Sequence, residues 1–409
     1  MPAGRTLVLA VDGLDEHDIG ALTDGTGPIA AATPLRIRPG GPSEPAPALT
    51  SLVTGASVAH TGVATQAPFR PDRPDRRSIW YAEAVTAPTL LETAQELGLV
   101  TAALQWPATA GASLDLCLPL VEDLGRFRNR WEMTEQTSSP RMVAEHLRAR
   151  REAGVQLSQV PPDELVAEIA AECCHGGRLD LLAARLTGLG IERRSSGLET
   201  PATARALVDT VDAIARIVDA FAPDEDDRMV LVPGRPLVPT ALLVHPNAVL
   251  AAQGLAETEG TQLAGFRALV WPDGPRGVLH VRREEGPVVR DAAIGALREI
   301  SEHTRLQLRE VDDGVGATTE TDVIAVLEGT PGTVFGLSAT HRPLVEGDDP
   351  YYAGPRAVSD PSAPVTALAA GPGLPSSPAA GSWADLGVTL ARALGAPLPG
   401  ATAHGMCPA

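Results

Sequence analysis

The feature that most limits the fold of this chain is a regular alternation of apolar strands and helices. Thr6–Val11 (TLVLAV) is a continuous apolar run that ends at Asp12-Gly13, which is typical of a buried parallel strand with a polar residue at its carboxyl end. Further strands are expected at Val100–Gln105, Leu179–Leu186, Arg228–Val232 and Val365–Leu368, and helices at Pro45–Thr54, Thr89–Leu97, Ala202–Phe221 and Trp383–Leu394. This order predicts an α/β fold with a doubly wound, mainly parallel sheet flanked by helices.

Two regions interrupt the alternation and suggest a division into domains. Residues 120–175 are polar and helical in pattern, which indicates a cap-like region. Residues 240–335 mix short strands with one amphipathic helix at Arg290–Thr304, which predicts an inserted α+β subdomain. The core would then comprise residues 1–239 and 336–409, with residues 354–381, rich in Pro, Gly, Ser and Ala, mostly in loops.

The basic residues of the chain exclude several classes of function. All 33 of its Lys and Arg residues are Arg, so no lysine is present for a P-loop or a Schiff base. The net charge of −18 argues against a nucleic-acid partner. No run of 18 apolar residues predicts a membrane span, and the four cysteines lack a disulfide or metal-binding spacing. A cytoplasmic location is therefore expected, while the oligomeric state is not indicated.

Several short stretches occur in the order found in a known family. They are VLAVDGLD (8–15), APALTSLVTG (46–55), LQWPATAG (104–111), LDLLAARLTGLG (179–190), MVLVPG (229–234), ATHRP (339–343), ALAAGPGL (367–374) and WADLGVTLARALGAPLP (383–399). Together they resemble the alkaline phosphatase superfamily, specifically its type I phosphodiesterase/nucleotide pyrophosphatase branch. The resemblance implies an alkaline phosphatase-like fold, with two zinc ions held by Asp and His at the strand ends and a Thr or Ser nucleophile.

The residues at the positions of that implied site differ from the family pattern. Asp12 matches the first metal ligand, but the nucleophile position holds Pro45. The Asp-xxx-His element would fall on Gly190 and Arg194, and the Ser-Asp-His-Gly turn on residues 233–236 (PGRP). Since zinc needs about four ligands, or three and a water, the sequence predicts no zinc and no other cofactor.

Two arginines at former ligand positions suggest a different role for the pocket. Arg194 and Arg235 would place guanidinium groups there, and guanidinium binds phosphate or carboxylate groups in a bidentate manner. An anionic small molecule is therefore the expected ligand. Alternatively, the two arginines pair with Asp12, Glu192 or surface carboxylates.

The remaining candidates each have a structural alternative. Asp12, Glu44 and His341 are the candidate catalytic residues, although Asp12 could cap a helix, Glu44 could lie in a solvated loop and His341 could be ordinary polar filler. Candidate substrate-binding residues are Ser43, Trp106, Glu192, Arg194, Arg235 and Arg342. Ser43 could instead cap the following helix, and Trp106 could belong to the core.

Three functions fit this pattern. The first is a metal-independent protein that binds an anionic small molecule and performs repurposed acid–base chemistry, with specialised metabolism as its expected setting. The second is a catalytically inactive binding or scaffolding protein. The third is an active phosphodiesterase that uses Ser43 as its nucleophile.

Overall fold

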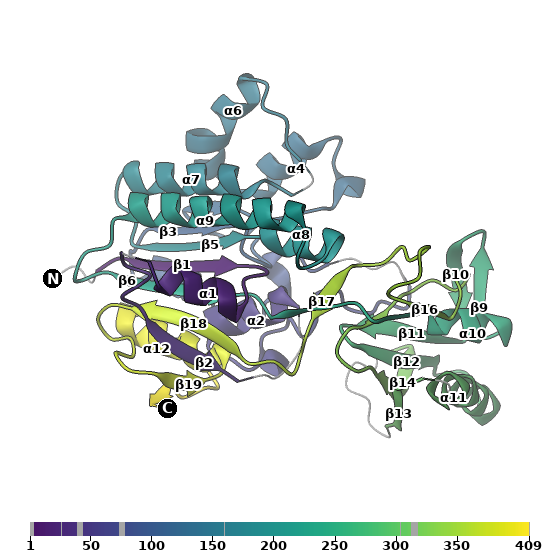
Figure 1. Cartoon of the computed structure of the whole chain (residues 1–409). Helices are drawn as coiled ribbons and strands as arrows, with labels where there is room; N and C mark the ends of the chain where they lie inside the picture. The colour runs from purple at the N-terminus through teal and green to yellow at the C-terminus, as the bar shows by residue number, and fades with distance from the viewer. Residues whose placement is uncertain are drawn as a thin grey trace.

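The computed structural model describes residues 4–25, 27–38, 44–72, 78–158, 160–302, 304–311 and 318–408. Figure 1 shows a larger body built around a central sheet and a smaller body that carries the chain from β8 (Leu242–Val244) to β16 (Leu344–Glu346). Both termini belong to the larger body. None of the helices in the described ranges has the length and apolar character that a membrane span needs.

The central sheet has nine strands within the described residues, in the order β20-β19-β2-β18-β6-β1-β5-β3-β4. They are β1 (Thr6–Val11), β2 (Thr33–Ile37), β3 (Thr101–Leu104), β4 (Leu116–Leu118), β5 (Leu181–Leu186), β6 (Arg228–Pro233), β18 (Val365–Ala370), β19 (Ala379–Gly381) and β20 (Cys407–Pro408). The five strands from β6 to β4 are parallel, whereas β18 runs antiparallel to both β6 and β2. The predicted fold class is confirmed.

Helices cover both faces of this sheet (Figure 1). One face carries α1 (Glu16–Thr23), α7 (Asp163–His175) and α9 (Pro201–Phe221), and the other carries α2 (Pro45–Thr54), α3 (Leu90–Glu96) and α12 (Trp383–Leu394). Successive side chains of a strand point to opposite faces, so Leu7 and Leu9 of β1 enter one core and Val8 and Ala10 enter the other.

Local signals in the sequence fix the ends of the helices beside the sheet. Pro45 occupies the first turn of α2, where its missing N–H costs no hydrogen bond, and Gly55 ends that helix with a φ of 61°. The α12 helix begins with a capping box between Ser382 and Asp385. The predicted bounds of α2 and α12 match the structure, whereas the ends of other elements shift by a few residues.

The first part of the predicted cap-like region 120–175 consists of short helices above the sheet (Figure 1). These are η3 (Leu124–Arg126), α4 (Arg130–Thr137), α5 (Pro140–Met142), a π-helical turn η4 (Val143–Leu147) and α6 (Arg148–Glu152), whereas the last part of the region, α7, packs on the sheet itself. Two single helical turns, η1 (Val58–His60) and η2 (Ala82–Ala84), precede the cap along the chain.

The smaller body has its own hydrophobic core. A sheet of β11 (Ala268–Asp273), β12 (Arg276–Arg282), β14 (Thr321–Glu328) and β13 (Gln307–Glu310) packs with α10 (Pro246–Ala252) and α11 (Pro287–Glu302). The hairpin of β9 (Ala256–Glu259) and β10 (Gln262–Phe266) and the sheet of β15 (Thr333–Phe335), β8 and β16 complete the body. Phe69, from the segment before β3, enters this core 5.3 Å from the ring of Trp271.

The boundary of the insertion differs from the prediction. The sequence placed the return to the core at residue 336, but β16 pairs with β8 inside the smaller body. A short antiparallel ladder of β7 (Leu237–Pro239) and β17 (Ala357–Ser359) joins the two bodies, and the chain rejoins the central sheet only at β18. The expected loop region 354–381 accordingly contains β17 and β19 besides the predicted strand, because pairing partners far along the chain order these short segments.

Candidate functional site

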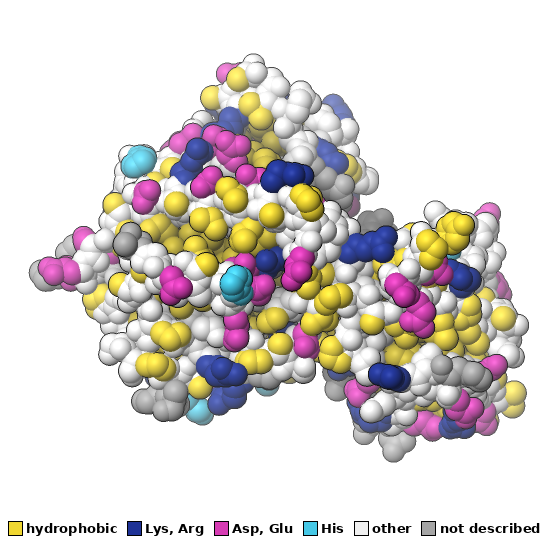
Figure 2. All heavy atoms as spheres, viewed as in Figure 1, with side chains coloured by type: hydrophobic (Ala, Val, Ile, Leu, Met, Phe, Trp, Pro, Cys, Tyr) yellow, Lys and Arg dark blue, Asp and Glu magenta, His cyan; other side chains and the backbone are white. Residues whose placement is uncertain are grey.

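The carboxyl ends of the central parallel strands face a pocket of about 380 Å³ between the two bodies. Figure 2 shows the molecular surface narrowing where these bodies meet. The larger body lines the pocket with Asp12, Glu44, Pro45, Gln66, Trp80, Leu120, Glu122, Val160, Arg185, Thr187, Ile191 and Arg194. The insertion contributes Pro272, Gly274, Pro275, Thr333, Val334 and Phe335. The segment around β17, which joins the two bodies, contributes Pro355, Ala357, Val358 and Ser359. Such a position is where open α/β sheets bind their ligands.

The floor of the pocket is an ion pair between neighbouring strands. Asp12 follows β1, and Arg185 lies near the end of the parallel strand β5. Asp12 Oδ2 accepts from Arg185 Nη2 at 2.5 Å, and Asp12 Oδ1 accepts from Arg185 Nε at 3.3 Å. Both side chains are less than a tenth exposed, so solvent screens this pair little. Asp12 therefore anchors an arginine at the end of the neighbouring strand.

Arg194 is placed beside this pair by α8 (Gly188–Ser196). Its nearest polar contacts are weak: 3.4 Å from Nη1 to the Gly190 carbonyl and 3.5 Å from Nη2 to the Ser359 hydroxyl. No carboxylate of the described residues lies within ion-pair distance of it. Burial lowers the pKa of Arg194 and the charge of Asp12 opposes this effect, but a guanidinium stays protonated in either case.

A buried hydroxyl lies in the same wall of the pocket. Thr187, between β5 and α8, is 3% exposed and lines the pocket. Its Oγ1 has no hydrogen-bond partner within the described part of the chain. Because buried hydroxyl groups are normally paired, this enclosed hydroxyl is an exception in the wall of the pocket.

Three features hold α8 against the sheet. Arg193 is buried and donates to Asp18 Oδ2 at 2.7 Å, which ties α8 to α1. Asp163 of α7 accepts from the N–H groups of Thr187 and Gly188 at 2.9 and 3.1 Å, and so caps the start of α8. A Cβ on Gly190 would lie only 2.8 Å from the Asp12 Cβ, so this close approach requires glycine.

Glu44 and Pro45 form the opposite side of the pocket, at the start of α2. Glu44 Oε2 accepts from the Gln66 N–H at 2.7 Å and from the Thr65 hydroxyl at 3.2 Å. A smaller hollow beneath connects these two residues, Asp12 and Arg194 with Arg235. Arg235 donates to the Pro361 carbonyl at 3.1 Å, and burial lowers its pKa. Arg235 thus lies below the pocket rather than in its wall.

The described residues do not fit the two zinc ions that the resemblance implies. Both oxygens of Asp12 accept from Arg185, and the implied ligand positions at residues 190, 194 and 233–236 hold only Pro, Gly or Arg, whose side chains offer no lone pair to a cation. Within the described ranges no three His, Cys, Asp or Glu side chains come together to hold a metal ion. No zinc-dependent step follows from this arrangement.

Several predicted site residues lie elsewhere. His341 and Arg342 are exposed in the loop before β16, where Arg342 pairs with Asp349 at 2.6 Å. The pairing of β16 with β8 holds this loop with the smaller body, away from the strand ends. Glu192 accepts from Ser196 and lines a separate groove between α7 and α9. Trp106 is 1% exposed in the core, and Ser43 lies outside the described residues.

The sequence reasoning missed Arg185 and Thr187. Arg185 could have been identified from the sequence, because a charged residue inside an otherwise apolar strand (LLAARL) needs a buried partner. The missing hydrogen bond of Thr187 has no counterpart in the sequence, since it depends on what surrounds the hydroxyl in three dimensions.

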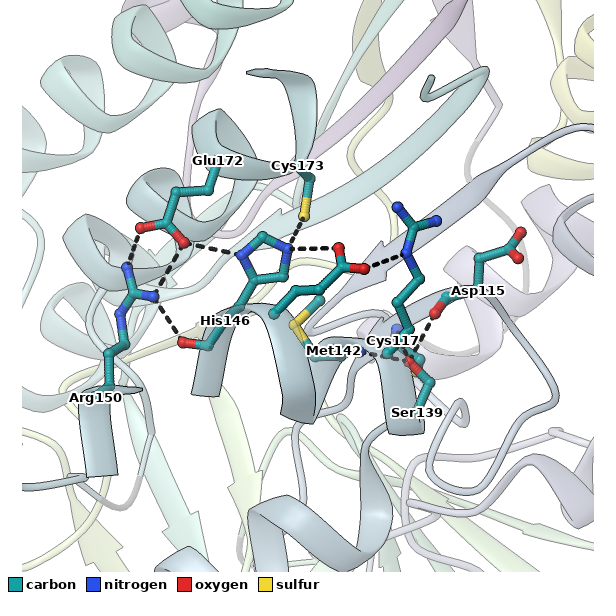
Figure 3. A network of polar contacts seen from close by, with 10 residues as sticks. Asp115, Cys117, Ser139, Met142, His146, Arg150, Glu172 and Cys173 are labelled. Carbon is teal, nitrogen blue, oxygen red and sulfur yellow. Dashed lines mark hydrogen bonds and ion pairs between the residues drawn. The ribbon is translucent and has the colours of Figure 1, made fainter. Parts of the chain in front are cut away.

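A second cluster of titratable groups lies in the cap (Figure 3) and contributes no residue to the pocket. His146 Nδ1 lies 2.9 Å from Glu172 Oε2, and His146 Nε2 lies 3.6 Å from Cys173 Sγ. Arg150 also bonds to Glu172, at 2.7 Å. Cys173 is 3% exposed, and burial raises its pKa to about 12. A protonated, buried thiol is a poor nucleophile, so this network fastens the π-helical turn to α7.

The fold and the position of the pocket define an α/β protein of the alkaline phosphatase type. The human ectonucleotide pyrophosphatase/phosphodiesterase 5 structure is similar, with a TM-score of 0.61 and 13% identity over 98% of this chain and 97% of that chain. An inactive variant of the murine protein in complex with AMP gives a TM-score of 0.60 and 14% identity, with the same coverage.

The family itself is shown by the sequence. The model for type I phosphodiesterase / nucleotide pyrophosphatase matches residues 6–313, well over half of the chain. The chain therefore belongs to this family. A search of curated proteins found no match.

Proposed function

We propose that this protein binds a small oxyanion in the pocket at the strand ends, without a metal ion. Arg194 is the observation that carries the proposal. Two neighbouring buried arginines have carboxylate partners: Arg185 bonds to Asp12, and Arg193 bonds to Asp18. Within the described ranges the guanidinium of Arg194 has two polar contacts, of 3.4 and 3.5 Å, and it lies in the same wall as the unpaired hydroxyl of Thr187.

This arrangement favours anion binding over zinc-dependent phosphodiester hydrolysis. The family chemistry that the resemblance implies needs a metal-activated hydroxyl, and the metal would supply both the charge and the nucleophile. Here the guanidinium of Arg194 supplies a fixed positive charge in place of a cation, which binds an anion but generates no alkoxide. Asp12 is committed to Arg185, so Glu44 is the carboxylate best placed for acid–base chemistry on a bound molecule.

Calorimetric titration of the full chain with phosphate and with acetate tests the proposal. We expect Arg194→Gln to weaken binding about 10-fold to 100-fold, since a hydrogen bond to a charged group contributes about 1.5–3 kcal/mol. Arg298→Gln, which breaks an exposed pair with Glu310 on the smaller body, is the control and should leave binding unchanged. Equal binding by the wild type and Arg194→Gln would overturn the proposal.

Two further measurements separate the alternative functions. Elemental analysis should find less than one zinc per chain, and bis(4-nitrophenyl) phosphate should not be hydrolysed. Two zinc ions per chain together with hydrolysis would instead support an active phosphodiesterase that uses Ser43. Oxyanion binding that Glu44→Gln leaves unchanged, with no turnover of any bound anion, would support a catalytically inactive binding protein.

A further inference from the structure

Glu122 is a carboxylate of the pocket that the anion site does not use. It lines the pocket from the segment after β4, it is exposed, and it makes neither a hydrogen bond nor an ion pair within the described ranges. The other carboxylates that line the pocket are engaged, because Asp12 bonds to Arg185 and Glu44 accepts from the Gln66 N–H. Glu122 is therefore the carboxylate that a cationic group of a ligand can approach.

Trp80 brings an aromatic ring to the same corner of the pocket. It lines the pocket and packs against a small apolar cluster that contains Val121, the residue before Glu122. The Trp80 carbonyl accepts from the Ala110 N–H at 3.1 Å, which fixes the backbone at this position. An alkylammonium group is attracted both by the face of a tryptophan ring and by a carboxylate. This corner therefore has the chemistry of a subsite for an ammonium group.

The positive charge of the pocket lies at a different strand end. Arg194 is on α8, which follows β5, whereas Glu122 follows β4, and β3 lies between these two strands. Neighbouring strands are about 4.8 Å apart, so the ends of β4 and β5 are separated by about 10 Å. A ligand that contacts both side chains therefore needs its opposite charges at the two ends of a chain rather than on adjacent carbon atoms.

We propose that the ligand is an amino carboxylate with separated charges, whose carboxylate is bound by Arg194 and whose ammonium group lies between Glu122 and Trp80. This inference rests on the proposed function and names the ligand class. One guanidinium fork fits the two oxygens of a carboxylate. The insertion adds the apolar side chains of Val334 and Phe335, which suit a methylene chain, and a pocket of about 380 Å³ suits a small molecule.

Calorimetric titration of the full chain with three related carboxylates tests the inference. 6-Aminohexanoate carries both charges at the ends of its chain, hexanoate lacks the ammonium group, and 2-aminohexanoate carries both charges on neighbouring carbon atoms. We expect 6-aminohexanoate to bind about 10-fold more tightly than 2-aminohexanoate, because only the longer separation reaches both subsites.

Two variants assign this preference to the proposed corner. Glu122→Gln and Trp80→Leu should each weaken the binding of 6-aminohexanoate about fivefold, while hexanoate binding changes less than twofold. Glu83→Gln is the matched control, because Glu83 is an exposed carboxylate of η2 that does not line the pocket. It removes the same charge and should leave the affinities for both ligands unchanged.

The outcomes separate this inference from the proposed function. If binding depends on Arg194 but Glu122→Gln changes both ligands equally or not at all, the ammonium subsite is overturned and the anion site stands. Equal affinities for 6-aminohexanoate and 2-aminohexanoate, or binding of acetate without any binding of 6-aminohexanoate, would also overturn it. Binding of hexanoate and 6-aminohexanoate that Arg194→Gln leaves unchanged would refute the proposed function itself.

Discussion

The ion pair between Asp12 and Arg185 gives the sharpest test of the site as described. If Asp12 anchors Arg185, replacing it by Asn removes the only charge that neutralises this guanidinium within the described residues. The arginine would then remain at the end of β5, 9% exposed and without a carboxylate partner. Asp12→Asn should therefore destabilise the larger body strongly.

The size of the effect follows from burial and geometry. The pair has contacts of 2.5 and 3.3 Å between side chains that are 8% and 9% exposed, so it is not a screened surface pair. Removal of one partner of such a pair costs about 3–5 kcal/mol, because an uncompensated charge stays buried. A surface pair would contribute at most about 1 kcal/mol. We expect Asp12→Asn and Arg185→Gln each to lower the free energy of unfolding by about 3 kcal/mol.

Urea unfolding of a double-mutant cycle measures this coupling. The double variant Asp12→Asn/Arg185→Gln should lose clearly less stability than the sum of the two single variants, since neither charge is left unpaired. EDTA should leave all four midpoints unchanged. Additive losses below about 1 kcal/mol, or a large loss of wild-type stability in EDTA, would refute the assignment of Asp12 as an arginine anchor.

Three further predictions concern the surroundings of the pocket. Arg193→Gln should remove the ion pair between α8 and Asp18 and lower the free energy of unfolding, measured in urea, by about 3 kcal/mol. It should also weaken anion binding, measured by calorimetry, because α8 is held less firmly. Unchanged values in both assays would contradict the role of this ion pair. Burial raises the pKa of Asp163 in the folded protein, whereas the unfolded value is about 4. Protonation of the Asp163 carboxyl group therefore stabilises the folded protein below pH 4, and this stabilisation is lost as the pH rises through the folded pKa. Asp163→Asn should flatten the dependence of the urea midpoint on pH above 4. An unaltered slope would contradict a raised pKa of Asp163 in the folded protein. In a Cys174→Ser/Cys407→Ser background, which removes the half-buried thiol of Cys174, Cys117 and Cys173 should resist DTNB at pH 8 until urea unfolds the chain, because both are buried and burial raises each pKa to about 12. Rapid reaction in the native state would show these two thiols to be exposed.

Much of the fold could be predicted from the sequence, because it follows from local sequence patterns. The apolar run of β1 and the proline and glycine signals that bound α2 each act within a few residues, and the ordered stretches identified the family. Local sequence patterns could not predict the boundary of the insertion. It depends on the pairing of β16 with β8 across about a hundred residues, and both strands are only three residues long.

The candidate site, like the fold, could be predicted from the sequence only in part. The sequence by itself placed Asp12 at a strand end, showed that all cationic side chains other than His are guanidinium groups, and drew attention to Arg194. Only the tertiary structure decided which guanidinium meets which carboxylate. Arg193 and Arg194 are neighbours in sequence, but successive residues of a helix point about 100° apart, so Arg193 bonds to Asp18 and Arg194 faces the pocket. Parallel pairing of β1 with β5 commits Asp12 to Arg185, which leaves Arg194 without a carboxylate partner among the described residues.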